Sequence, residues 1–364
     1  MAKKQPVVAV IGLGLIGGSI CYALRKQNLV LYGVSSRRSI SRALEMGIID
    51  HGFEYDEMGK AVGKSDYVFI CTPLTDIAQK IPVVFKYAPA GSIVTDAGST
   101  KTVICSIAQN QTDSRGCFIG GHPMTGSEKR GIENANPYLF YDAVYVLTPS
   151  SATPRKAVKK LSSLISAMGA RVMVISPRVH DRIAASVSHL PQLLAVLLTN
   201  HLADKNDDLF RNLAAGGFRD MTRIASSSYQ IWKDIISTNT GEIKKSLLQY
   251  RDQLDRLVEN LENDQYMKSA FETACRERKT IPRYGKGFLK PLVDVRVNVK
   301  DRPGEIARIS NVIYYHGVNI KDIEIVNIRE GEGGVLRIGF AEKPEAQKAA
   351  RALKDVGYEV VVLD

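Results

Sequence analysis

Short apolar runs alternate with helical patterns over the first half of the chain. The runs lie at Val7–Ile11, Leu29–Val34, Tyr67–Cys71, Ser92–Thr95, Cys117–Ile119, Ala143–Leu147 and Arg171–Val174. Such alternation of strands and helices is typical of a mainly parallel sheet covered by helices. We therefore predict an α/β domain over residues 1–176.

Helical patterns alone fill the next part of the chain. From Pro177 to about Lys279 no strand pattern recurs, and apolar residues follow a heptad-like spacing. These residues are Ile235, Ile243, Leu247, Tyr250, Leu254, Leu257 and Leu261. The stretch 281–287 is rich in proline and glycine and is typical of a linker. The pattern predicts a separate all-helical domain over residues 177–284.

The last part of the chain returns to strands. Valines at every second position from 293 to 299 alternate with polar residues, which indicates a half-buried strand. A turn at 301–304 and a helical pattern follow, then strands around 323–328 and 335–340, a helix over about 344–354 and a strand at 359–363. We predict a βαββαβ domain over residues 291–364.

Composition limits the class of protein. The chain has 364 residues with 45% hydrophobic and 24% charged residues, which suits two or three globular cores. No apolar run approaches the roughly 20 residues of a membrane-spanning helix. Five cysteines are scattered singly, without the spacing of metal ligands or of a disulfide framework. We expect a cytoplasmic protein without a membrane partner and without a bound metal.

The net charge of +11 indicates anionic partners. Because lysines and arginines are spread along the chain without a long basic block, the charge favours a small anionic cofactor and substrate over nucleic acid. Nucleic acid is therefore not an expected partner.

Gly12, Gly14 and Gly17 form a GxGxxG turn between an apolar strand and a helix. In a dinucleotide site the first glycine permits the tight turn, the second admits the pyrophosphate and the third allows close packing of helix and strand. Amides at the helix N-terminus favour the phosphates. The turn predicts a doubly wound sheet of the Rossmann type and a nicotinamide-dependent oxidoreductase. To the same cofactor site we assign Leu15, Ile16, Thr72 and Pro73.

The end of the second strand bears on the choice of cofactor. An NAD site usually has an acid there, which binds the ribose 2′-hydroxyl. This chain instead has Ser35, Ser36, Arg37 and Arg38, two hydroxyls and two guanidiniums that suit a 2′-phosphate. The prediction is NADP, with NAD as the alternative if the arginines only solvate the start of the next helix.

His122 is the candidate base. It follows a predicted strand near the carboxyl edge of the sheet, where α/β enzymes bind ligands. Oxidation of an alcohol needs a base for the hydroxyl proton, and histidine, with a usual pKa of about 6.5, suits that task. The alternative is a histidine that only caps the strand end.

Several further motifs, together with the glycine turn and the His122 segment, resemble prephenate dehydrogenases, including their arogenate-using relatives. They are Asp96–Lys101, Ser188–Pro191 and Gly217–Ala225, with Trp232 downstream. The resemblance covers nearly the whole chain. It implies hydride transfer coupled to decarboxylation of a cyclohexadienyl acid in tyrosine biosynthesis, and a homodimer formed through the helical domain.

The resemblance also implies roles for single residues. His122 would be the catalytic base, Ser99 would orient its imidazole, and Arg223 would bind a substrate carboxylate. Further substrate-binding candidates are His189, Gln192, Ser127, Glu128 and Asp220. Gln192 departs from the histidine of several prephenate-using relatives, which leaves arogenate open as the substrate. His180, His201 and Trp232 are expected to be packed or surface helix residues.

The βαββαβ pattern resembles an ACT domain, a small amino-acid-sensing module. The resemblance implies tyrosine as a feedback effector, with Asp301, Pro303, Gly304, Asn319 and Ile320 as candidate contacts. The alternative is a module that only supports dimerisation. Two other functions remain open: a tyrosine-binding regulatory protein without activity, and a hydroxyacid-type dehydrogenase on the same scaffold.

Overall fold

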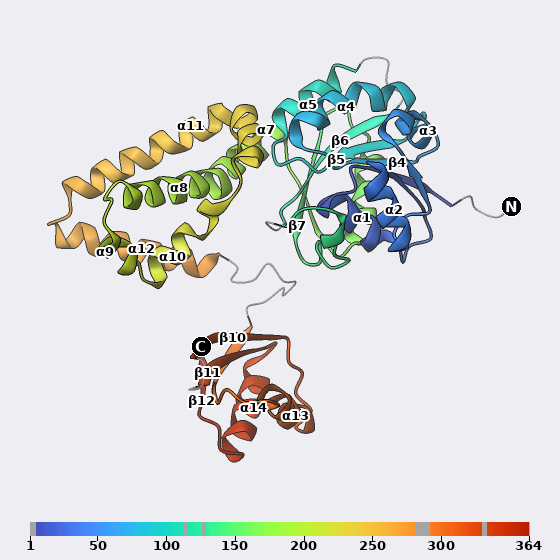
Figure 1. The fold of residues 1–364 in the computed structure, drawn as a ribbon. Helices are drawn as coiled ribbons and strands as arrows, with labels where there is room; N and C mark the ends of the chain where they lie inside the picture. Colours follow the sequence, from blue (N-terminus) through green and yellow to red (C-terminus); the bar gives the residue numbers. More distant parts are fainter. Residues whose placement is uncertain (1–4, 112–115, 126–128, 282–291, 330–332, 364) are drawn as a thin grey trace. The chain divides into compact units, whose positions relative to one another are not determined.

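The computed structural model describes residues 5–111, 116–125, 129–281, 292–329 and 333–363. The chain divides into two compact units, Met1–Ala274 and Cys275–Asp364. The first unit holds an α/β sheet domain and most of the helical segment, and the second holds a smaller sheet with two helices (Figure 1).

Within the described residues, the first unit has an eight-stranded sheet in the order β3-β2-β1-β4-β5-β6-β7-β8. The strands are β1 Val7–Ile11, β2 Val30–Val34, β3 His51–Phe53, β4 Tyr67–Ile70, β5 Ile93–Asp96, β6 Cys117–Pro123, β7 Val144–Pro149 and β8 Arg171–Val174. All neighbours are parallel except β6 and β7. The predicted mainly parallel sheet is confirmed. The three-residue strand β3 was not predicted, because so short a run has no readable period.

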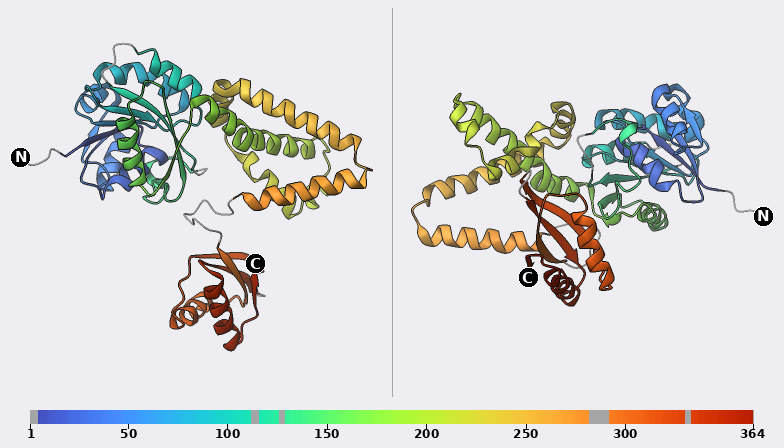
Figure 2. Two further views of the ribbon diagram at one scale, coloured as in Figure 1. Left: turned by 180° about the vertical axis from the view of Figure 1, so that it is seen from behind. Right: turned by 60° about the horizontal axis from the view of Figure 1, so that its bottom comes forward.

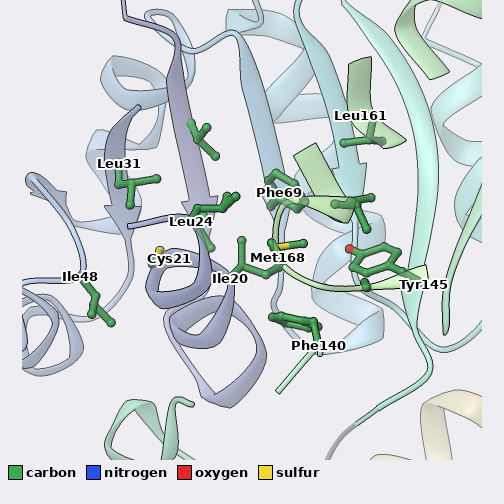
Figure 3. Packing of buried hydrophobic residues seen from close by; sticks show 14 of the residues in the cluster. Ile20, Cys21, Leu24, Leu31, Ile48, Phe69, Phe140, Tyr145, Leu161 and Met168 are labelled. Carbon is green, nitrogen blue, oxygen red and sulfur yellow. The ribbon is translucent and has the colours of Figure 1, made fainter. Parts of the chain in front are cut away.

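Helices cover both faces of this sheet. They are α1 Leu15–Leu24, α2 Arg37–Glu45, α3 Met58–Val62, α4 Leu74–Tyr87, α5 Thr102–Gln109 and α6 Arg155–Ser166, with short 3₁₀ turns η1 Tyr55–Glu57 and η2 Ile132–Asn134. Side chains alternate along β1, so that Val8 and Val10 join one apolar cluster and Ala9 and Ile11 join the other. Figure 3 shows the first cluster, where Ile20 and Leu24 of α1 lie near other labelled core residues. The fold is therefore doubly wound, as predicted.

Only helices follow β8 in the first unit. They are α7 Pro177–Ala184, a π-helical turn η3 Ala185–His189, α8 Leu190–Ala203, α9 Asp208–Asn212, α10 Gly216–Thr222, the 3₁₀ turn η4 Arg223–Ser226, α11 Tyr229–Glu259 and α12 Asp264–Thr280, whose end belongs to the second unit. In both views of Figure 2 the segment from α8 to α11, green to orange, is helical throughout. The prediction of an all-helical segment is confirmed.

The helical run from Pro177 to Ala203 corrects one expectation. By length and composition it could cross a bilayer, whereas the sequence showed no apolar run of that length. Its polar residues His180, Asp181 and His189 are buried, and Asp181 accepts hydrogen bonds from the backbone of the sheet domain. One such run is weak evidence for a membrane span, because core helices of soluble proteins pass the same test of length and composition.

The second unit has the predicted βαββαβ order. Its elements are β9 Val293–Val299, α13 Glu305–Tyr315, β10 Asp322–Arg329, β11 Gly333–Phe340, α14 Lys343–Asp355 and β12 Val360–Leu363. The sheet is antiparallel in the order β10-β11-β9-β12. Val295 and Ile338 of the sheet pack with Ile309 of α13 and Leu353 of α14 in one apolar cluster.

Candidate active site

The glycine turn has the geometry of a dinucleotide site. Gly12 has φ +96°, and a Cβ there would lie 2.9 Å from the backbone of Cys71. A Cβ on Gly17 would lie 2.0 Å from the carbonyl oxygen of Gly12, so the third glycine is required by close packing. A Cβ on Gly14 would meet nothing within 4 Å, which leaves that face of the turn open at the N-terminus of α1. A pyrophosphate fits the open face and the free amides of the first helical turn.

A cavity of about 500 Å³ adjoins this turn. Six of the predicted site residues line it: Leu15, Ile16, Thr72, Pro73, Ser99 and His122. The hydroxyl of Thr72 is buried and has no hydrogen-bond partner among the described residues. An orphaned buried hydroxyl is costly, so a polar group of a ligand would satisfy it. The cavity thus joins the cofactor turn to the candidate base.

Helix α11 forms another wall of the cavity through Gln230, Ile231, Asp234 and Ile235. It is anchored to the sheet domain because the hydroxyl of Thr75 donates to the carboxylate of Asp234. Arg130 also lines the cavity. Sequence reasoning missed Arg130 and the α11 residues because nothing in the local sequence shows which distant segment will close the cavity.

His122 lies on β6, which runs four residues beyond the end of the predicted strand at Ile119. It pairs with Val146 of β7. Its Nδ1 lies 2.8 Å from Nε2 of His180. His180 Nδ1 in turn lies 2.8 Å from Oδ1 of Asp181. Both residues are on α7 and are 2% exposed, which shows that the contact is built into the core.

These contacts add a partner of His122 to those expected from sequence. The hydrogen bond at Nδ1 of His122 is made by His180, whereas Ser99 had been expected to orient the imidazole. Ser99 lines the same cavity. His180 is a packed helix residue, as expected, but its hydrogen bond to His122 was missed. The adjacent pair His180–Asp181 just after the N-cap Ser176 was the available signal.

Burial is the main reason that the pKa of the His122 imidazole lies well below its usual 6.5. His180 and Lys101 lower that pKa further. Burial raises the pKa of the Asp181 carboxyl, but the hydrogen bonds from His180 and Thr102 outweigh it, and the net pKa is lowered. The site therefore combines an ionised Asp181 with a neutral His122 at neutral pH.

A buried ion pair fixes the strand beside His122. Lys101 and Asp96 are both 0% exposed, and the Lys101 ammonium donates to the Asp96 carboxylate. The ammonium also donates to the carbonyl of Gly121 at 2.7 Å, while Asp96 Oδ1 accepts from the Gly121 amide at 3.0 Å. The amide and the carbonyl of Gly121, the residue before His122, are therefore both held by hydrogen bonds.

His189 and Gln192 do not line the cavity. His189 is 2% exposed, its Nδ1 is 3.3 Å from Nδ2 of Asn239, and its ring meets Trp232 edge-on. Burial lowers the pKa of His189 from 6.5 to about 4. Gln192 is buried and donates to the carbonyl of Ile224 at 2.9 Å. In this structure both residues support the helical segment from inside.

The remaining substrate candidates lie elsewhere. Arg223 and Asp220 are exposed on η4 and α10 and do not line the cavity. Gln192 holds the turn that carries Arg223, through the bond to Ile224. Ser127 and Glu128 lie outside the described residues.

The four residues after β2 differ in exposure. Ser35 is buried, and its hydroxyl accepts from the amide of Leu13 at 3.4 Å. Ser36 caps α2. Arg37 and Arg38 are exposed, and Arg37 Nε donates to Glu54 at 3.1 Å. Ser35 thus supports the glycine turn, and the two arginines are accessible to a ligand.

The second unit has its own cavity of about 340 Å³ between β9 and α13. Asp301 and Gly304 line it, whereas Pro303, Asn319 and Ile320 do not. Arg302 and Glu305 add an ion pair of 2.5 Å at the same turn. Across the described residues of both units, no group of three or more His, Cys, Asp or Glu side chains is placed to hold a metal ion.

Comparisons with known proteins agree with this geometry. Residues 20–174 match the model of the prephenate dehydrogenase nucleotide-binding domain, and residues 176–273 match that of the prephenate dehydrogenase dimerization domain. The chain is 32% identical to a prephenate dehydrogenase of Bacillus subtilis (strain 168), with 97% of each chain covered.

Two solved structures are also similar. Arogenate dehydrogenase from Synechocystis is 30% identical with a TM-score of 0.69, over 75% of this chain and 99% of that one. Prephenate dehydrogenase from A. aeolicus, in complex with hydroxyphenyl propionate and NAD+, is 28% identical with a TM-score of 0.69, over 77% and 99%. These matches and the cavity that joins the glycine turn to His122 show that the chain belongs to the prephenate dehydrogenase family.

Proposed function

We propose that the chain oxidises and decarboxylates prephenate to 4-hydroxyphenylpyruvate, with His122 as the base. The observation that carries this proposal is the placement of His122 in one cavity with the glycine turn. A bound nicotinamide supplies the hydride acceptor. His122 takes the proton of the ring hydroxyl as the hydride leaves the same ring carbon. Loss of the ring carboxylate as carbon dioxide then leaves an aromatic phenolate, and return of the proton from His122 gives the phenol. The protein contributes orientation and charge complementarity.

Two arginines are the proposed partners of the substrate carboxylates. Arg130 lines the cavity, and Arg223 lies on η4, whose backbone is held by Gln192. A guanidinium binds a carboxylate through two parallel hydrogen bonds. We assign binding of a substrate carboxylate to Arg223, as the resemblance implied. Asp220, Ser127 and Glu128 remain proposed neighbours of the substrate.

Arogenate is the second candidate substrate. Gln192, which replaces a histidine of several prephenate-using relatives, already uses its amide on Ile224. It offers no cation to a keto acid and no fixed partner to an ammonium group. Initial rates with each substrate, followed by reduced nicotinamide and by product identity, decide between them. Absence of turnover with both would refute the proposal and favour a regulatory protein without activity.

NADP is the proposed cofactor, with NAD as the alternative. The support is the exposed pair Arg37 and Arg38 at the start of α2. Arg37→Ala should lower kcat/KM for NADP about tenfold or more and leave that for NAD nearly unchanged, since a charge-assisted hydrogen bond contributes about 1.5–3 kcal/mol. Arg155→Ala, an exposed arginine at the start of α6, is the control. An unchanged ratio between the cofactors would contradict the assignment.

The second unit is proposed to be an ACT domain that binds tyrosine. Its βαββαβ order and the cavity at Asp301 and Gly304 support this. Feedback requires tyrosine to bind two enzyme states with different affinities. Initial rates with added L-tyrosine should fall, and Ala307→Leu, which fills part of the cavity, should weaken that inhibition. Rates that do not respond to tyrosine would contradict the proposal and favour a domain that only supports dimerisation.

A cytoplasmic homodimer is the proposed assembly. Tyr250, Leu254 and Val258 recur at every fourth position of α11 and are 39%, 48% and 61% exposed. An exposed apolar stripe of this kind suits an interface. Sedimentation should show a dimer, and Leu254→Glu should shift it toward the monomer. A wild-type monomer would contradict this assembly.

A further inference from the structure

We propose that His180 and Asp181 are positioning residues that hold His122 in the tautomer whose Nε2 is unprotonated. The inference rests on the proposed function for its catalytic meaning, but the proton positions can be tested without substrate. The three side chains form a line in which His122 Nδ1 meets His180 Nε2, and His180 Nδ1 meets Asp181 Oδ1, each at 2.8 Å.

The direction of each hydrogen bond follows from the carboxylate. Asp181 Oδ1 accepts from the Lys101 amide and Oδ2 from the Thr102 amide, each at 2.8 Å. An ionised carboxylate only accepts, so His180 Nδ1 carries the proton of that bond. In a neutral His180 ring Nε2 is then an acceptor, and His122 Nδ1 must donate to it. The remaining nitrogen of His122, Nε2, is left with its lone pair.

The line is held rigidly at its far end. Asp181 receives two amides at the start of α5, and its own backbone carbonyl accepts from Asn239 of α11 at 2.8 Å. The two imidazole rings meet edge-on with centroids 5.0 Å apart. Since His180 and Asp181 are 2% exposed, water cannot readily replace either partner. The pair therefore keeps one geometry while the cavity stays accessible to the ligand.

This arrangement has a direct consequence for proton transfer. A base in the other tautomer would present an N–H to the substrate hydroxyl and could not accept its proton. With Nδ1–H donated to His180, the hydroxyl proton passes to Nε2, and the resulting imidazolium keeps its Nδ1–H bond. The logic is that of a histidine oriented by a buried acid, with one further histidine between the base and the acid.

The structure also defines the competing arrangement. If His180 were doubly protonated, its Nε2–H would donate to His122 Nδ1, and His122 would carry its proton on Nε2. These two states differ in which nitrogen of His122 is protonated. Nitrogen-15 NMR of histidine-labelled full-length enzyme distinguishes them, with His122→Gln used to assign the signals of His122.

We expect the neutral His122 ring to show a protonated Nδ1 and an unprotonated Nε2 above the pH range in which it titrates. In His180→Leu the acceptor is lost, so the signal should become that of a tautomer mixture, and kcat should fall about a hundredfold with KM changed less than threefold. His180→Gln keeps an acceptor oxygen and should recover part of kcat. His201→Leu, an exposed histidine on α8, should leave both readouts unchanged.

A protonated Nε2 on His122 in the wild-type enzyme would overturn the proposal. So would a His180→Leu variant with wild-type kcat and an unchanged tautomer. If His180→Leu does not fold, the wild-type spectrum and the Gln variant still decide. If the enzyme oxidises neither prephenate nor arogenate, the proposed function fails while the spectrum still tests the proton positions.

Discussion

Replacement of Lys101 by methionine should destabilise the first unit by about 3 kcal/mol. Lys101 and Asp96 are both 0% exposed and form an ion pair. Loss of one partner of a buried pair costs about 3–5 kcal/mol because the other charge is left uncompensated. We expect the lower end of that range, because the amides of Gly98 and Gly121 continue to serve the Asp96 carboxylate at 2.9 and 3.0 Å.

Urea unfolding followed by tryptophan emission measures this effect. The chain has a single tryptophan, Trp232 on α11, so the emission reports the first unit. The double variant Asp96→Asn, Lys101→Met removes both charges at nearly constant volume and should recover much of the lost stability, as neutral replacements of buried pairs commonly do. A Lys101→Met loss below about 1 kcal/mol, the scale of an exposed pair, or a double variant no more stable than the single one would refute the reasoning.

Three further predictions follow from the same contacts. His122→Asn should lower kcat about a hundredfold or more through loss of the base, while the exposed control His201→Asn keeps wild-type kcat; equal rates would remove His122 from that role. Folding lowers the pKa of His122 and lowers that of His189 to about 4. The folded state therefore binds fewer protons than the unfolded state below pH 6.5. The free energy of unfolding should therefore be greatest above pH 6.5 and fall as the pH is lowered toward 4. Urea midpoints that rise as the pH is lowered from 6.5 to 4 would contradict the burial argument. Arg337→Met should speed amide exchange in β9 and β11, because the guanidinium, 7% exposed, pairs with Asp294 and two other carboxylates; unchanged exchange would show that the cluster contributes little.

Titratable and charged groups surround His122. His122 is faced by His180 and Asp181 of α7, by His189 of η3 and by Lys101 before α5. Burial and the cationic neighbours act in one direction, and Asp181 acts in the other. The acidic limb of kcat/KM should therefore lie below pH 6.5, because His122 must be neutral to accept a proton.

The cofactor turn and the base could be predicted from the sequence because both depend on local constraints. The turn at Gly12 needs a left-handed φ, and the close approach at Gly17 leaves no room for a Cβ. Only glycine suits these positions, so the motif could be recognised from a single sequence. His122 was legible from its place at the end of a strand. The order of strands and helices was legible from apolar periodicity.

The orientation of the base could not be predicted from the sequence, because it depends on a contact between residues 58 positions apart. Which of many polar side chains meets His122 is decided by how α7 packs against α5 and β7, and no local pattern predicts that packing. Ser99 lines the cavity beside His122, so its orienting role stays a prediction, and the structure adds His180 as the partner of His122 Nδ1. Arg130 was missed for the same reason.

The proposed reaction is tested most directly by measuring carbon dioxide and reduced nicotinamide together, with prephenate and NADP, in the wild-type enzyme and in His122→Asn. We expect equal molar yields of both products in the wild type and a parallel loss of both in the variant. Reduced nicotinamide without carbon dioxide, or a variant as active as the wild type, would contradict the proposal.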